Sequence, residues 1–206
     1  MYDILSPPEK TRADSFRFPH LRTAFVVSHA LLRRVLAEYL EQSPERIEFD
    51  YGEWGKPFIR GAELFFSMSH SADMAVYAIG PERLIGVDVE ALRPLPDYLA
   101  IAARTFSEAE SRQIAAAQLQ AFYNCWTRKE AYVKALGTGL GTALDGFEVS
   151  LAPDQAVEIV AIEGDYQRAR NWSLFDLQPA PGYAGALAVW GREWSIQHLP
   201  LPQEYD

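Results

Sequence analysis

Three acidic side chains and one lysine lie in two short segments whose spacings suit a metal and phosphate site. Residues 86–90 read GVDVE, and residues 126–134 read WTRKEAYVK. On a strand, Asp88 and Glu90 point to one face because side chains alternate with a period of two, whereas the neighbouring valines point to the other face. Adjacent carboxylates repel each other unless a cation or solvent lies between them, and hard oxygen ligands suit Mg²⁺. A strand end whose acids face water is the alternative.

Glu130 and Lys134 belong to the second segment and share one face of a predicted helix, because residues four apart lie one turn apart. A Glu before a Lys at this spacing is also a common surface pair that stabilises a helix by about 0.3 to 0.5 kcal/mol. Apolar residues occupy most of the rest of this helix and leave only a narrow charged face: Phe122, Cys125, Trp126, Val133 and Leu136. If the two segments converge, they form a site for a divalent cation and a phosphate.

Residues 69–71 read SHS between two predicted strands. A histidine flanked by two hydroxyls can donate several hydrogen bonds to phosphate oxygens. The same residues are typical of an ordinary turn. A catalytic pair of Ser69 and His70 is disfavoured, because adjacent residues do not normally face each other as a nucleophile and its base must. The sequence contains no P-loop, no dinucleotide-binding glycine pattern and no zinc-type spacing of Cys and His.

The composition is that of an ordinary folded protein. The chain has 206 residues, of which 49% are hydrophobic, and this is enough for a sizeable core. A formal charge of -9 argues against general nucleic-acid binding, which needs a surplus of Lys and Arg. Cys125 is the only cysteine, so an internal disulfide is excluded and a reducing compartment is favoured. Without a secretory leader or about 18 consecutive apolar residues, we expect a cytoplasmic protein that does not enter the membrane.

The first 34 residues are basic although the whole chain is acidic. They contain six Lys or Arg residues and three acids. A locally basic edge suits a small or local anionic partner. A solvated, partly mobile N-terminal arm is the alternative.

Hydrophobic periodicity predicts the elements that position these residues. The pattern predicts a helix over residues 25–40 and then strands at 47–49, 64–67, 74–79 and 84–89, with residues 69–73 as a connection. Helices are predicted at 99–104, 107–119 and 121–136, and a capping box of Ser107 and Glu110 opens the second of them. The last predicted strands are residues 147–151, 157–162, 172–177 and 184–190.

This order of helix and strands, followed by helices and strands, predicts an α+β fold in two parts joined near residues 93–97. We expect a structural duplication, with an N-terminal half-domain at residues 1–95 and a C-terminal half-domain at residues 96–206. No sequence repeat supports the duplication, which rests on the order of elements alone.

Taken in order, the motifs resemble those of the 4'-phosphopantetheinyl transferases of the surfactin-synthetase-activating type. The matching segments are GKP at residues 55–57, SHS at 69–71, GVDVE at 86–90, FS at 106–107 with Glu110, WTRKEAYVK at 126–134 and PGY at 181–183. Each motif is weak alone, but their joint order and spacing over residues 20–190 are specific.

The resemblance implies a pseudo-twofold monomer of two similar α+β halves, with coenzyme A and Mg²⁺ or Mn²⁺ held between them. It implies that Asp88, Glu90 and Glu130 bind the metal and that Lys134 binds phosphate, with Asp88, Glu130 and Lys134 as the catalytic residues. Other contacts to coenzyme A are implied for Gly55, Lys56, Ser69 and His70. For its 3'-phosphate, the N-terminal candidates are Arg17, His20, Arg22 and His29, of which Arg22 is our choice.

The implied reaction moves 4'-phosphopantetheine from coenzyme A to a serine of an apo acyl carrier protein or peptidyl carrier domain and releases adenosine 3',5'-bisphosphate. Glu130 or a metal-polarised water takes the serine proton, and we favour metal ligation as the main role of Glu130. Two other classes are a non-catalytic carrier-binding module and a Mg²⁺-dependent nucleotide or phosphate-ester hydrolase. The intact set of Asp88, Glu130 and Lys134 argues against the first, and nothing in the sequence marks a positioned water for the second.

Overall fold

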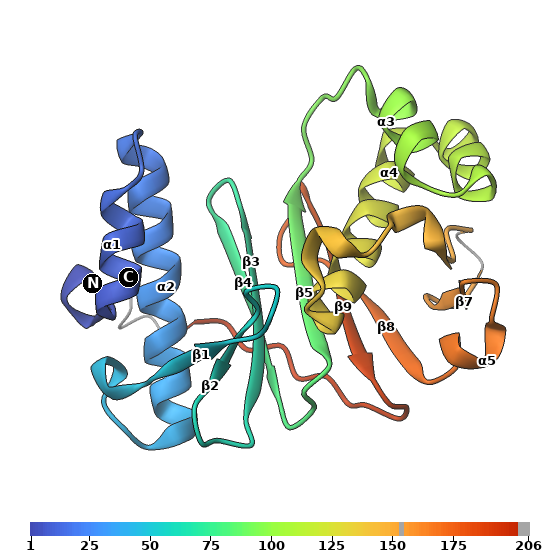
Figure 1. The fold of residues 1–206 in the computed structure, drawn as a ribbon. Helices are drawn as coiled ribbons and strands as arrows, with labels where there is room; N and C mark the ends of the chain where they lie inside the picture. Colours follow the sequence, from blue (N-terminus) through green and yellow to red (C-terminus); the bar gives the residue numbers. More distant parts are fainter. Residues whose placement is uncertain (153–154, 202–206) are drawn as a thin grey trace. The chain divides into compact units, whose positions relative to one another are not determined.

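Two helices form most of the N-terminal part of the chain in the computed structural model, which describes residues 1–152 and 155–201. Helix α1 (Pro7–Asp14) and helix α2 (Pro19–Leu40) lie side by side (Figure 1). Ser6 caps α1 in a reciprocal capping box with Glu9. Glu9 is buried and pairs with the buried Arg33 of α2 at 2.7 Å. The basic N-terminal segment is therefore folded rather than a solvated arm.

The chain divides into two compact units. The smaller unit comprises residues 1–50, residues 59–61 and the C-terminal segment from Ser195. It contains α1, α2 and the short 3-10 helices η1 (Tyr2–Ile4) and η2 (Pro44–Arg46). The larger unit comprises residues 51–58 and 62–194. It carries both of the acidic motifs.

The strands of the larger unit are mostly antiparallel pairs. Strand β3 (Phe65–Ser71) pairs with β4 (Met74–Gly80), and β5 (Ile85–Ala91) pairs with β9 (Tyr183–Trp190). Strand β8 (Trp172–Leu177) lies on the other side of β9, so this sheet has the order β5-β9-β8 (Figure 1). This unit also contains the pair of β6 (Phe147–Val149) with β7 (Ile159–Ile162). The short strands β1 (Phe49–Tyr51) and β2 (Pro57–Ile59) pair with each other, and each crosses a boundary between the two units along the chain.

Residues 69–71 belong to strand β3 and are not the connection that the sequence predicted. The turn is formed by Ala72 and Asp73, and Ala72 adopts a left-handed φ of 53° there. These residues form a strand because side chains alternate between its two faces, which places Ser67, Ser69 and Ser71 on one face of β3. The hydroxyls of all three are hydrogen-bonded to β5. Polar residues that resemble a turn thus form one side of a strand.

Helix α4 (Glu108–Leu136) is the long element that carries the WTRKEAYVK motif. It follows α3 (Tyr98–Thr105) and begins at the predicted capping box of Ser107 and Glu110. Gln118 has non-helical angles inside it, so two helical segments meet there, as the two predicted helices require. The helix ends at Gly137, whose φ of 72° is a left-handed conformation that glycine adopts without strain.

The core of the larger unit lies between α4 and the strands that follow it. Tyr132 of α4 contacts Phe147 and Trp172, with ring centroids 4.6 and 4.7 Å apart. Cys125 is fully buried in this core, as expected for a small apolar residue. The short elements η3 (Gly139–Gly141), η4 (Leu144–Gly146) and α5 (Tyr166–Ala169) connect the larger ones.

The α+β class is confirmed, and the predicted duplication into halves at residues 1–95 and 96–206 stays a prediction. Over the described ranges 1–152 and 155–201, none of the helices combines the length and the apolar character that a membrane span needs.

Candidate active site

Strand β5 carries Asp88 into the interior of the larger unit. Val87 and Val89 are 1% exposed, and Asp88 between them is only 4% exposed, so both faces of this strand are covered. The alternative of acids at a strand end that face water is therefore wrong for Asp88. Glu90, two residues later on the same face, is partly buried.

A lysine and a serine meet the same oxygen of Asp88. Lys134 Nζ lies 2.6 Å from Asp88 Oδ1, and Ser69 Oγ donates to that oxygen at 2.9 Å. Lys134 also donates to Ser69 Oγ at 2.8 Å. The three residues come from α4, β5 and β3 and form a closed triangle of hydrogen bonds. The predicted convergence of the two motifs is thus found at Asp88 and Lys134.

The second oxygen of Asp88 has a different environment. Asp88 Oδ2 is buried, and no group in the described part of the chain donates a hydrogen bond to it. A buried carboxylate oxygen without a donor is costly unless another positive group can reach it. This oxygen is therefore the best candidate for a ligand atom in the site.

Burial raises the pKa of Asp88, against the opposing charge of Lys134 and the hydrogen bonds from Lys134 and Ser69. Burial also raises the pKa of Glu90, and the charge of Asp88 adds to that effect. The pKa of Glu130 is raised by burial first and then by the charges of Asp88 and Glu90. The three carboxylates therefore repel one another across the space between β5 and α4.

Glu130 and Lys134 do not form the surface pair that their spacing allows. Lys134 forms its ion pair with Asp88, which is 46 residues away in sequence. Its side chain is 32% exposed, so Lys134 lies at the edge of the cluster and is partly accessible to solvent. The narrow charged face of this helix therefore faces β5, and Glu130 and Lys134 do not pair with each other along the helix.

The three carboxylates suit a hard divalent cation, because such a cation prefers carboxylate oxygens and neutralises the repulsion between them. Asp88 Oδ2 lacks a donor, and the acids Asp88, Glu90 and Glu130 disfavour one another's charge. In the described residues, however, no group of three or more Asp, Glu, His or Cys side chains is arranged closely enough to hold a metal. A shared metal therefore requires a rearrangement of these side chains.

Gly86 sets how closely α4 approaches β5. A methyl group at residue 86 would lie 2.1 Å from Ala131 O and 2.2 Å from Ala135 N, which is far inside contact distance. Only glycine allows the backbone of the helix to lie on the strand at this point. Because Glu130 and Lys134 directly precede the two contacting residues on α4, Gly86 helps to set their distance from Asp88.

Two further charged residues of the same motif anchor α4, and sequence reasoning missed them. Lys129 is fully buried, forms an ion pair with Glu110 at 2.8 Å and donates to Leu144 O at 2.7 Å. Arg128 pairs with Asp176 of β8. Charged residues amid the apolar residues of a mostly buried helix were the available signal, because such charges need partners.

Glu90 is held by the last serine of β3. Ser71 Oγ donates to Glu90 Oε2 at 2.7 Å and accepts from Ala91 N at 3.1 Å. Beyond it, the hydroxyl of Tyr183 bonds to the carboxylate of Asp73, which joins the PGY motif to the β3–β4 turn. His70 is exposed on the face of β3 opposite to Ser69 and Ser71.

The GKP turn lies beside a cavity of about 300 Å³ in the larger unit. Its lining includes Trp54, Lys56, Phe58, Phe66, Arg83 and Thr138. Lys56 Nζ donates to Ile85 O at 2.9 Å and to Ala135 O at 2.8 Å. Burial, with the charge of Arg83, lowers the pKa of Lys56 to about 8, so the amine is protonated at neutral pH.

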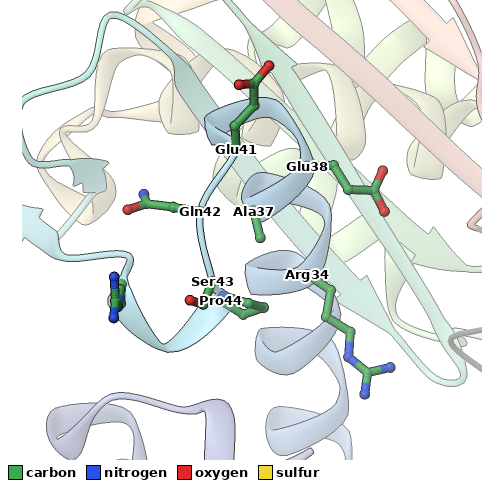
Figure 2. A pocket seen from close by; sticks show the side chains of 8 residues that line it. Arg34, Ala37, Glu38, Glu41, Gln42, Ser43 and Pro44 are labelled. Carbon is green, nitrogen blue, oxygen red and sulfur yellow. The ribbon is translucent and has the colours of Figure 1, made fainter.

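The N-terminal candidates lie in the smaller unit. Arg22 pairs with Asp14 at 2.9 Å, and His29 Nδ1 lies 3.1 Å from Glu9 Oε1. A larger and shallow hollow of about 670 Å³ also belongs to this unit, at the C-terminal end of α2. Figure 2 shows Arg34, Glu38 and their neighbours around it, and none of the predicted site residues is among them.

Two family models match the chain. The model described as "4'-phosphopantetheinyl transferase superfamily" matches residues 84–188, which include β5 and α4. The model described as "4'-phosphopantetheinyl transferase, N-terminal" matches residues 1–82.

Known proteins of similar sequence carry the same description. The chain is 38% identical over 198 residues to the 4'-phosphopantetheinyl transferase HetI of a Nostoc species, a match that covers 92% of this chain and 80% of the relative. It is 34% identical over 155 residues to a 4'-phosphopantetheinyl transferase of Bacillus subtilis, covering 72% of this chain and 68% of the relative. A solved structure, the holo-[acyl-carrier-protein] synthase of Thermotoga maritima, has a TM-score of 0.42 at 25% identity and covers 53% of this chain and 63% of its own.

Proposed function

Because the chain belongs to the 4'-phosphopantetheinyl transferase superfamily, we propose that it transfers 4'-phosphopantetheine from coenzyme A to a serine hydroxyl of an apo carrier protein. The partner is an acyl carrier protein or a peptidyl carrier domain. The second product is adenosine 3',5'-bisphosphate.

The triangle of Asp88, Lys134 and Ser69 is the observation that carries the proposal. It brings a cation, a hydroxyl and a buried carboxylate with one unbonded oxygen to the same point. These groups suit a pyrophosphate: a cation for its charge, a hydroxyl for its oxygens and a carboxylate that would hold a divalent metal.

Asp88, Glu90 and Glu130 would hold Mg²⁺ or Mn²⁺ through their carboxylate oxygens. The bound metal would neutralise the charge that gathers on the pyrophosphate as the bond to the leaving group breaks. Lys134 exchanges its bond with Asp88 for one to a pyrophosphate oxygen and stabilises the departing adenosine 3',5'-bisphosphate. Ser69 donates its single hydroxyl proton to Asp88 and so orients that carboxylate, and a bond from Ser69 to phosphate would replace this one.

The reaction forms a bond between the serine oxygen of the carrier and the β-phosphorus and breaks the bond from that phosphorus to the bridging oxygen. The serine proton passes to a water molecule or to Glu130, whose raised pKa makes it a better proton acceptor than an exposed glutamate. We assign metal ligation to Glu130 as its main role, because one carboxylate can hardly serve as both a tight ligand and a strong base.

The cavity beside Gly55 and Lys56 suits the adenine ring. Its aromatic side chains, among them Trp54 and Phe58, offer flat apolar surfaces for a base. His70 is exposed on its strand, and the family resemblance supports a contact of this residue with a phosphate group of coenzyme A. For Arg22, the family resemblance alone supports a contact with the 3'-phosphate.

A product analysis tests the proposal. The protein is incubated with coenzyme A and Mg²⁺, with or without an apo carrier protein, and the release of adenosine 3',5'-bisphosphate is followed by liquid chromatography. We expect release only when the carrier is present, and we expect chelation of the metal to stop it. Equal release without any carrier would contradict the proposal and would indicate the hydrolase instead.

A further inference from the structure

Lys56 uses all three of its ammonium donors on backbone carbonyls. Lys56 Nζ lies 2.8 Å from Ala135 O, 2.9 Å from Ile85 O and 3.3 Å from Arg83 O. Ile85 begins strand β5, and Ala135 lies in the last turn of α4. One side chain from a loop therefore links the two elements that carry the acidic motifs.

The carbonyl of Ala135 is one of the last four in α4, which have no partner within the helix. A cation at this end of a helix is also favoured by the direction of the helix dipole. The stem of Lys56 packs on Gly137, where an added methyl group would lie 2.9 Å from Lys56 Cδ. A methyl group added to Gly141 would lie 3.6 Å from the ring of Trp54, which belongs to the same loop. The loop is thus fastened to the end of α4 by both polar and apolar contacts.

Lys134 and Asp88 lie close to the two ends of this link. Lys134 is the residue before Ala135, and Asp88 lies three residues after Ile85. Between the two elements, the backbone of α4 lies close to Gly86, where an added methyl group would lie 2.1 Å from Ala131 O and 2.2 Å from Ala135 N. The hydrogen bonds of Lys56 join the last turn of α4 to the start of β5 and oppose a separation of helix and strand there.

We propose that Lys56 is a positioning residue that holds the last turn of α4 on strand β5 and so keeps Lys134 beside Asp88, rather than a direct ligand of coenzyme A. If Lys56 bound coenzyme A through its ammonium, it would have to give up its hydrogen bonds to three backbone carbonyls. Those carbonyls would then be left without a cation in a partly buried place, which is unfavourable. The ammonium therefore stays with the protein while the turn around it borders the cavity.

Hydrogen exchange without any substrate tests the link itself. Lys56→Met keeps most of the stem and removes the ammonium. We expect the amides of residues 133–138 and 85–88 to exchange about tenfold faster or more in this variant, because the helix end can then open. Arg83→Met, which removes an exposed cation from the same cavity but keeps its carbonyl, should leave these amides unchanged. Unchanged exchange in Lys56→Met would overturn the proposal.

Kinetics separates positioning from direct binding, and this part rests on the proposed transferase function. We expect Lys56→Met to lower kcat about tenfold or more even at saturating coenzyme A, because Lys134 is misplaced in the transition state. A defect that saturating coenzyme A removes would mean that Lys56 binds the donor directly. If Lys56→Met does not fold, Lys56→Gln takes its place in both measurements. If the wild-type protein transfers nothing, the proposed function fails, while hydrogen exchange still decides the role of Lys56.

Discussion

At the scale of single residues, the two oxygens of Asp88 differ in what they bind. Oδ1 accepts hydrogen bonds from Lys134 and Ser69, whereas Oδ2 is buried without a donor among the described residues. The bonds to Oδ1 fix the orientation of the carboxylate and so direct Oδ2 at one position. A carboxylate that is held in this way is already oriented before a cation binds.

The substitution Asp88→Asn tests this role, because it keeps the shape of the side chain and removes its charge. We expect transfer to fall about 100-fold or more, since both the metal ligand and the partner of Lys134 are weakened. The circular dichroism spectrum should remain that of the wild type. Asp145→Asn, at an exposed acid of the same unit, is the matched control and should retain full activity. Normal turnover by Asp88→Asn would show that the metal site lies elsewhere.

At the scale of elements, the contact of α4 with β5 depends on the missing side chain of Gly86. We expect Gly86→Ala to reduce transfer strongly and to cost about 1 to 3 kcal/mol of stability, as overpacking of a close contact does. Gly80→Ala places its methyl group 3.7 Å from Ile85 and is the matched control. The free energy of urea unfolding and the transfer rate are measured for both variants. Equal behaviour of the two variants would contradict the assigned spacing role.

The ion pair of Lys129 with Glu110 joins the two segments of α4 across the bend at Gln118. We expect Lys129→Met to lower the free energy of unfolding by about 3 to 5 kcal/mol, because it leaves the buried carboxylate of Glu110 unpaired. The double variant with Glu110→Leu should recover part of the loss. Arg112→Met, at an exposed pair with Glu108, should leave stability nearly unchanged. Strictly additive losses in the urea unfolding of the double variant would speak against the buried pair.

The packing of α1 on α2 should depend on pH through Glu9. Burial raises the pKa of Glu9, but hydrogen bonds from His29 and Ser6 and the charge of Arg33 outweigh it and lower the pKa from 4.5 to about 2. The ionised carboxylate of Glu9 therefore stabilises the folded state fully above pH 4.5, and this stabilisation is lost as the pH falls toward 2. It contributes about 3 kcal/mol to the free energy of unfolding.

Urea unfolding of the wild type and of Glu9→Gln from pH 7 to pH 3 measures this effect. The difference in unfolding free energy between them should shrink as the pH falls through this window. Glu45→Gln, at an exposed acid of the same unit, should follow the wild type throughout. A constant difference between wild type and Glu9→Gln would mean that Glu9 stabilises the helices by shape alone.

At the scale of the whole molecule, the predictable features were those with a local signal. The hydrophobic pattern of the sequence predicted strand β5 and helix α4, and the capping box predicted where α4 begins. The order of motifs identified the family, and the resemblance is confirmed. The surfactin-synthetase-activating type, the monomeric state and the class of carrier protein stay predictions.

The contacts that build the site were less accessible, because they join residues far apart in sequence. The bond between Asp88 and Lys134 spans 46 residues, and that between Ser69 and Lys134 spans 65. Ser69 and Ser71 resemble turn residues until β5 provides partners for their hydroxyls. The residues around Lys56 show no pattern that indicates its role. Its carbonyl acceptors become apparent only when the positions of β5 and the end of α4 are known.

The most direct test of the whole account is the intact mass of a carrier protein after reaction. An apo acyl carrier protein is incubated with coenzyme A, Mg²⁺ and the wild-type protein, and its mass is compared with that of a carrier whose acceptor serine is replaced by alanine. We predict that the first carrier gains the mass of one phosphopantetheine and that the second gains nothing. No gain on any of several acyl and peptidyl carriers, while coenzyme A is hydrolysed, would contradict the account.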